Sequence, residues 1–152
     1  MKNVFVVAAV SLFALTANAQ SVKEKKARAA VDDAFAESTK KVSACGKTFK
    51  FVYDWKSFDA IDFAKIGRDK MGQYGSEVPN VAGFGEAINK LCADKDYKEA
   101  LGKISTIVYK PTNDDSITVK GTVASGTLTL ENYCFGSTRD AGDYEKAAAD
   151  AL

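Results

Sequence analysis

The sequence contains no histidine among its 152 residues. Histidine is the general base of Ser-His-Asp and Cys-His catalysis, a frequent zinc ligand and the usual proton switch near neutral pH, so these chemistries are excluded. No serine stands in a G-x-S-x-G turn, and no glycine-rich segment has the spacing and flanking elements of a phosphate-binding loop. These absences favour a protein that is not an enzyme and needs no cofactor.

Cysteine is scarce, with only three residues, Cys45, Cys92 and Cys134. Their spacings of 47 and 42 residues match no zinc-binding pattern such as C-x-x-C, so no metal site is expected. In an oxidising compartment the natural arrangement is one disulfide and one free thiol. We favour the pair Cys45–Cys92, because both residues fall near the ends of predicted helices, on their apolar sides. The two pairings that involve Cys134 stay open.

A basic excess is also missing. The chain has 21 basic and 20 acidic residues, and residues 1–19 contain one of the basic residues, Lys2, and no acidic one. The rest of the chain is therefore formally neutral, whereas proteins that bind nucleic acids usually carry a basic excess that neutralises phosphates. A nucleic-acid partner is not expected.

Long apolar runs are absent after residue 19, so no membrane span is expected there. Residues 1–19 are typical of a cleavable secretory signal: Lys2 precedes an apolar run from Val4 to Leu15, and Ala17-Asn18-Ala19 supplies the small residues of a cleavage site. No cysteine follows the cleavage point, which argues against a lipoprotein. The expected product is one globular domain, residues 20–152, in the periplasm or outside the cell, and a monomer is compatible with it.

What is present is a succession of helical and strand patterns. Apolar residues recur at helical spacing over 21–45, and period-2 alternation marks a strand over 49–55. The rest of the expected series is helices over 59–71, 80–92 and 94–101, a loop over 72–79, strands over 104–110, 117–123 and 127–134, and a helix from 138. The expected helix caps are Ser21, Asn80, Asp94 or Asp96, and Thr138, and the expected hairpin turn is Ser125-Gly126. This order, α-β-α-α-α-β-β-β-α, predicts an α+β domain. We expect an antiparallel sheet of about four strands with the helices packed on one face.

The most unusual local feature is a row of aromatic residues on one face of the strand 49–55, namely Phe49, Phe51, Tyr53 and Trp55. Facing inward, such a row forms the core of a sheet. Facing a pocket, it forms a stacking surface or the wall of an apolar cavity. We treat these four residues as candidate ligand-binding residues.

Three functions fit these observations. The first is a non-catalytic protein that binds another protein or a component of the cell envelope or exterior. The second is a carrier of a small apolar ligand, with the aromatic row lining its cavity. The third is a carboxylate-dependent hydrolase, since acidic side chains are plentiful, although no spacing identifies a catalytic pair. An enclosed cavity favours the carrier, facing carboxylates in a cleft favour the hydrolase, and a filled interior favours the binding protein.

Overall fold

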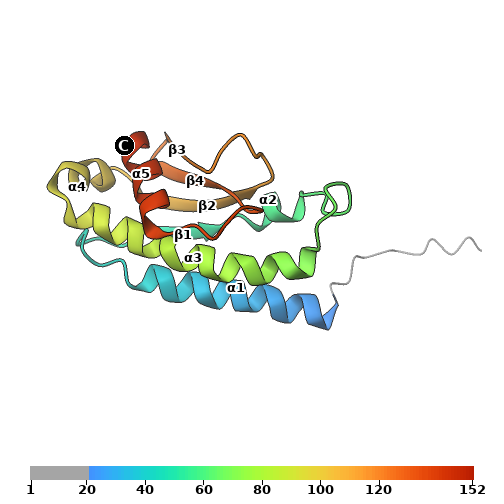
Figure 1. Cartoon of the computed structure of the whole chain (residues 1–152). Helices are drawn as coiled ribbons and strands as arrows, with labels where there is room; N and C mark the ends of the chain where they lie inside the picture. The colour runs from blue at the N-terminus through green and yellow to red at the C-terminus, as the bar shows by residue number, and fades with distance from the viewer. Residues whose placement is uncertain (1–20) are drawn as a thin grey trace, which may run out of the picture.

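Five helices and a four-stranded mixed sheet make up residues 21–152, the part of the chain that this computed structural model describes (Figure 1). In chain order the elements are α1 (Val22–Lys40), β1 (Lys50–Tyr53), α2 (Trp55–Asp59), α3 (Lys70–Ala93), α4 (Lys95–Gly102), β2 (Thr106–Thr112), β3 (Val119–Ala124), β4 (Thr127–Tyr133) and α5 (Ala141–Ala151). The predicted α+β class is confirmed. The predicted signal sequence lies outside the described residues.

The predicted antiparallel sheet is wrong in most of its pairings. The strand order is β1-β2-β4-β3, and both the β1–β2 and the β2–β4 pairs are parallel. Only β3 and β4 run antiparallel, joined by the predicted turn at Ser125 and Gly126. These two residues have φ angles of 48° and 74°, the positive values that a tight two-residue hairpin turn requires.

The mixed topology follows from how apolar the last two strands are. In β4, Leu128 and Leu130 are fully buried. In β3, the residues paired with them, Val123 and Gly121, are exposed and half-buried. The more apolar strand β4 therefore takes the central position beside β2, where more surface is removed from water, and β3 becomes the edge.

Helix α3 includes the segment 72–79, which the sequence predicts to be a loop because of its glycines and Pro79. Asp69 begins the helix by accepting hydrogen bonds from the backbone N–H groups of Met71 and Gly72. Proline removes one backbone donor within a helix, yet the segment buries Tyr74 completely against the core. Burial of this face outweighs the local preference for a turn.

Other predicted boundaries also differ. Helix α1 ends at Lys40 rather than at Cys45, and Trp55 begins α2 instead of ending the strand. The predicted helix over 59–71 is replaced by turns that lead into α3. Asn80 lies within α3 and does not cap it, and Asp140 rather than Thr138 caps the last helix.

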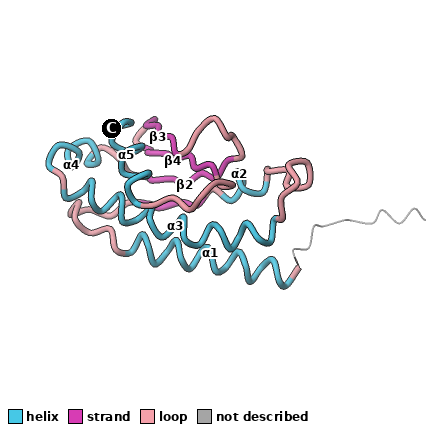
Figure 2. Tube along the Cα trace, viewed as in Figure 1, coloured by secondary structure: helices cyan, strands magenta, loops and turns pink. Residues whose placement is uncertain are grey.

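The three long helices pack on the same face of the sheet; in Figures 1 and 2, α1 and α3 lie below the strands and α5 crosses them at the left. An aromatic ring from each contacts Tyr109 of β2, with ring centroids 6.3 Å away for Phe35 of α1, 5.6 Å for Phe84 of α3 and 6.1 Å for Tyr144 of α5. Helices α1 and α3 approach closely where Gly85 meets Ser38. The absence of a side chain at Gly85 allows this approach, since a Cβ there would collide with the Ser38 carbonyl. Within residues 21–152, no helix combines the length and the apolarity needed to cross a bilayer.

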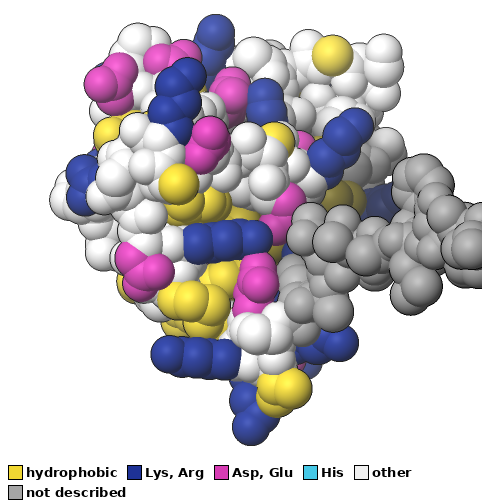
Figure 3. Space-filling model, turned by 90° about the vertical axis from the view of Figure 1, so that its right-hand side faces the viewer, with side chains coloured by type: hydrophobic (Ala, Val, Ile, Leu, Met, Phe, Trp, Pro, Cys, Tyr) yellow, Lys and Arg dark blue, Asp and Glu magenta, His cyan; other side chains and the backbone are white. Residues whose placement is uncertain are grey.

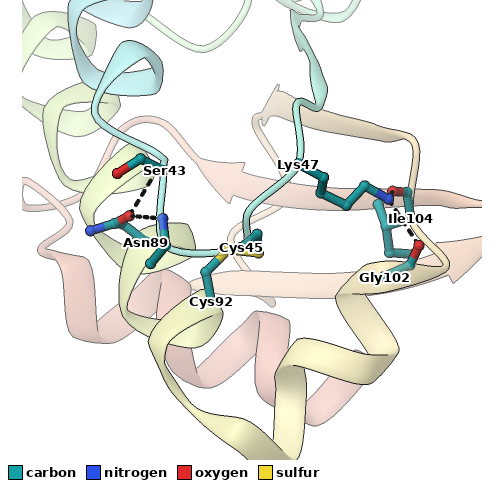
Figure 4. Close-up of a disulfide and its surroundings, with 8 residues drawn as sticks. Ser43, Cys45, Lys47, Asn89, Cys92, Gly102 and Ile104 are labelled. Atoms are coloured by element: carbon teal, nitrogen blue, oxygen red, sulfur yellow. Dashed lines mark hydrogen bonds between the residues drawn. A yellow bond between two sulfur atoms is a disulfide. The ribbon is translucent and has the colours of Figure 1, made fainter.

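A disulfide joins Cys45 to Cys92, as predicted, and Cys134 is a buried free thiol (Figure 4). The bond fastens the loop after α1 to the last turn of α3. Hydrogen bonds reinforce this connection, since the Asn89 side chain accepts from the backbone N–H groups of Ser43 and Ala44. The disulfide is consistent with an oxidising compartment.

Candidate functional site

The four candidate aromatic residues lie together on the helix side of the sheet. Phe49 and Tyr53 are buried, whereas Phe51 and Trp55 are half-buried. Phe51 contacts Phe84 of α3 at 6.3 Å between ring centroids, and Tyr53 stacks on Tyr109 at 5.1 Å. These rings are thus packed against other side chains. Their ligand-binding role stays a prediction.

Trp55 is enclosed by groups that hold it in one orientation. Its indole N–H donates to Asp32 at 2.8 Å, one ring face lies 4.1 Å from the Arg28 guanidinium, and Tyr53 is 4.1 Å away between centroids. Arg28 also forms an ion pair with Asp59 at 3.0 Å. These contacts fasten α1 to α2, so the tryptophan joins two elements and does not stand free as a stacking surface.

A buried acidic residue, Glu77 of α3, forms the centre of a polar network inside the core. The Tyr53 and Tyr109 hydroxyls donate to its carboxylate at 2.9 and 2.8 Å, and the Gln73 amide donates at 3.2 Å. Asn132 in turn donates to the Tyr109 hydroxyl at 2.8 Å. None of the ion pairs found among residues 21–152 includes Glu77. The carboxylate is therefore held by neutral donors alone.

Burial dominates the electrostatics of this network. It raises the pKa of Glu77, and the hydrogen bonds from Tyr109 and Tyr53 offset this only in part. Burial next to Glu77 also raises the pKa of both tyrosines, so they stay protonated and can donate. The pKa of the nearby Cys134 thiol is raised to about 12, first by burial and then by Glu77, so this thiol is not the reactive thiolate form.

Two polar atoms beside this network, the Asn132 Oδ1 and the Tyr144 hydroxyl, have no hydrogen-bond partner among the described residues. Glu77 itself has no solvent exposure, so no substrate can touch its carboxylate in this conformation. The sequence did not identify the network around Glu77, because the segment 72–79 is predicted as a loop. The available signal was the spacing of Gln73, Glu77 and Asn80, which places them on one side of a helix.

The opposite face of the sheet is not covered by α1, α3 or α5, and we call it the open face. Its side chains alternate with those that pack under the helices, and not one of them is buried. The open face consists of Lys50, Val52, Thr106, Val108, Lys110, Thr112, Lys120, Thr122, Ala124, Thr127, Thr129, Glu131 and Tyr133. It is a surface of threonine and valine crossed by a charged row, in which Lys110 and Glu131 form an ion pair at 2.9 Å.

Among residues 21–152, three of the surface hollows lie elsewhere or at the margin of this face. One of about 340 Å³ lies between β3 and α5, one of about 300 Å³ between α1 and α3, and one of about 170 Å³ beside α2 and the end of β2. None of the three is lined by Phe49, Phe51, Tyr53 or Trp55. Among residues 21–152, no group of three or more acidic or cysteine side chains is placed to hold a metal ion.

Charges elsewhere are mixed in sign. Figure 3 shows one side of the molecule, where basic and acidic side chains alternate and hydrophobic side chains are visible between them.

Comparison of the chain with protein-family models, with curated proteins and with solved structures finds no match in any of the three. The function therefore has to be argued from the geometry of the chain itself.

Proposed function

We propose that this chain is an exported, non-catalytic binding protein that engages another protein through the open face. The observation that carries the proposal is that a sheet with mostly parallel pairing has one face without buried side chains. Parallel strands are normally covered on both faces. A surface that remains uncovered in such a sheet is available to a partner.

The interior supports a binding protein rather than a carrier or a hydrolase. The aromatic residues pack against one another and against α1 and α3, which fills the space that a carrier would need for its ligand. The most deeply buried carboxylate, Glu77, is held by three side-chain donors and is closed to solvent. A broad, flat surface suits a macromolecule better than a small ligand, which needs a concave site.

The charges of the open face indicate the chemistry of the partner. Lys110 and Lys120 stand on either side of Glu131 in the strand register, and Lys50 lies on β1. No ion pair within residues 21–152 uses Lys50 or Lys120. The face therefore carries a net positive charge, and a protein surface with acidic side chains complements it.

Site-specific photo-crosslinking tests this proposal. A photoreactive amino acid is placed at Thr129, at the centre of the open face, and in a matched variant at Glu86, which is exposed on α3. Both proteins are incubated with envelope extract of the source cells. We expect a discrete adduct from position 129 and none from position 86. Unlabelled wild-type protein should compete for it, and a Val108→Glu variant, whose added negative charge repels an acidic partner, should compete much less.

Adducts of equal yield from positions 129 and 86 would contradict the proposal. An adduct from position 129 that Val108→Glu competes away as well as wild type does would also contradict it. Circular dichroism and thermal unfolding of Val108→Glu provide the control for folding. Val108 is half-buried on the open face, so its replacement should leave the core intact.

A further inference from the structure

Strand β3 is an edge strand whose outer backbone groups are unpaired. The Tyr133 N–H donates to the Thr118 carbonyl at 3.1 Å, which fixes the alternation of hydrogen bonds along the β3–β4 pair. By this alternation, Lys120 and Thr122 direct their backbone groups toward β4. Val119, Gly121 and Val123 direct theirs outward, and no described residue pairs with β3 on that side.

This edge has few of the devices that usually block strand addition. Natural edges are protected by short strands, prolines, bulges, inward charges or charged side chains on the edge, especially lysine. Strand β3 extends over Val119–Ala124 without proline, and Lys120 is the only charged residue that protects it. The other edge, β1, has only four residues. The fold therefore offers one edge that is long enough to pair with a further strand.

Helix α5 gives the β3 edge a second wall. Gly121 lets the helix approach, because a Cβ there would collide with the Ala147 carbonyl. The hollow of about 340 Å³ follows, lined by Thr118 and Val119 on the strand side and by Asp143, Lys146 and Asp150 on the helix side. An unpaired strand edge beside a helix-walled groove is the arrangement that binds extended peptides by strand addition.

Charges define which strand would fit. Alternate side chains of an added strand would point toward α5, where Asp143 and Asp150 outnumber Lys146, and toward the open face, where Lys120 is the nearest charge. A second copy of this chain fits poorly. Antiparallel β3–β3 pairing would place the two Lys120 side chains opposite or diagonal to each other on the same face, which is unfavourable.

We propose that an extended segment of the partner protein adds to β3 as a fifth strand, with basic side chains toward α5 and an acidic side chain beside Lys120. This inference rests on the proposed binding function and names how the partner is held. The added strand would also widen the open face, so that one partner can contact both the edge and the face.

A proline substitution tests the outer edge of β3 without disturbing the rest of the fold. The outward N–H of Val123 takes no part in the β3–β4 pair, and the side chain is 43% exposed. Val123→Pro therefore removes an outward donor while leaving the ladder in place, as prolines on strand edges do. Val123→Thr keeps the donor and is the matched control. Thermal unfolding of both variants shows whether either one disturbs the fold.

The probe is a displayed library of random ten-residue peptides, selected on immobilised wild-type protein. We expect to recover peptides with alternating basic and acidic positions that bind Val123→Thr as well as wild type and bind Val123→Pro at least about tenfold more weakly. Amide exchange of Val119, Gly121 and Val123 should slow when such a peptide binds. Recovery of no peptide, or equal binding to both variants, would overturn the inference.

The two proposals can fail separately. If the photo-crosslink from Thr129 forms and is competed equally well by Val123→Pro and Val123→Thr, the open face is a binding surface and the edge inference is wrong. If no specific crosslink forms and no peptide is recovered, the binding function itself fails.

Discussion

The two faces of the sheet differ although the same strands build both. Under the helices, Ile107, Leu128 and Leu130 are fully buried. Their neighbours Val108 and Thr129, one position along the strand, are half-buried on the open face. The buried face supplies much of the apolar burial that stabilises the fold, and the open face contributes less to stability. Residues on the open face can therefore be set by binding rather than by stability.

Among the tests of the helix side of the sheet, removal of the disulfide should change the free energy of unfolding by one of the largest amounts. It closes a separation of 47 residues between the loop after α1 and the end of α3, and an entropy estimate for a loop of this size gives about 4 kcal/mol. Replacing both cysteines, as Cys45→Ala with Cys92→Ala, should lower the free energy of unfolding by about this amount in urea denaturation. An unchanged midpoint would mean that the native protein does not rely on this bond.

A pair of neighbouring substitutions compares the faces directly. Leu130→Ala removes a fully buried side chain and should cost about 2–5 kcal/mol, because it leaves a cavity. Thr129→Ala, on the open face of the same strand, should change the free energy of unfolding by no more than about 0.5 kcal/mol. Chemical denaturation measures both. Similar costs for the two variants would mean that the open face is part of the core.

The pH dependence of stability tests the polar network around Glu77. Burial raises its pKa in the folded protein, so the folded state binds this proton more tightly than the unfolded state. Its favourable contribution is complete below the unfolded-state pKa and is lost as the pH rises through the folded-state pKa. Glu77→Gln cannot lose that proton, so the variant should gain stability relative to wild type as the pH rises.

Each tenfold difference in proton affinity corresponds to about 1.4 kcal/mol. Unfolding measured in urea at several pH values from mildly acidic to mildly alkaline gives this difference. The control is Glu131→Gln, which alters a partly exposed ion pair with Lys110 and should change stability by less than about 1 kcal/mol. A constant difference between Glu77→Gln and wild type at every pH would refute the account of this network.

Apart from the control variants, the smallest expected loss of stability lies at the contacts of Trp55. Arg28→Ala removes the cation over the indole ring and the ion pair with Asp59, which together should cost about 1 kcal/mol. The fluorescence of Trp55, the only tryptophan, should shift to longer wavelength as water reaches the ring. Arg28→Lys keeps the charge and should shift it less. Unchanged emission in Arg28→Ala would show that Arg28 does not cover the ring in solution.

Local patterns in the sequence predicted some local features and missed others. The Ser21 side chain accepts the N–H of Glu24 at the start of α1, and Asp94 caps α4, because caps depend only on residues a few positions apart. The turn at Ser125 and Gly126 is local for the same reason. The predicted caps Asn80 and Thr138 are wrong, because the helices begin at other residues. The pairing Cys45–Cys92 was favoured on helix ends alone, although α1 stops before Cys45.

Features that depend on distant segments were missed. No local pattern shows that β4 inserts between β2 and β3, since this depends on how much apolar surface each strand can bury beside β2. The same holds for α3, where turn-forming residues near Pro79 are overridden by contacts with α1 and the sheet. Glu77 was missed with them. The alternation of Thr127 and Thr129 with Leu128 was visible, but joining these threonines to Val108 required the parallel register.

Accessibility of the open face inside cells tests the binding function most directly. Single cysteines are introduced as Thr129→Cys and, on the exposed side of α3, as Glu86→Cys, and labelled with a maleimide reagent. In the purified protein both should react readily. In intact source cells we predict that the cysteine at position 129 is protected by the partner while the one at position 86 reacts as before. Equal labelling of both positions in cells would contradict the proposed binding surface.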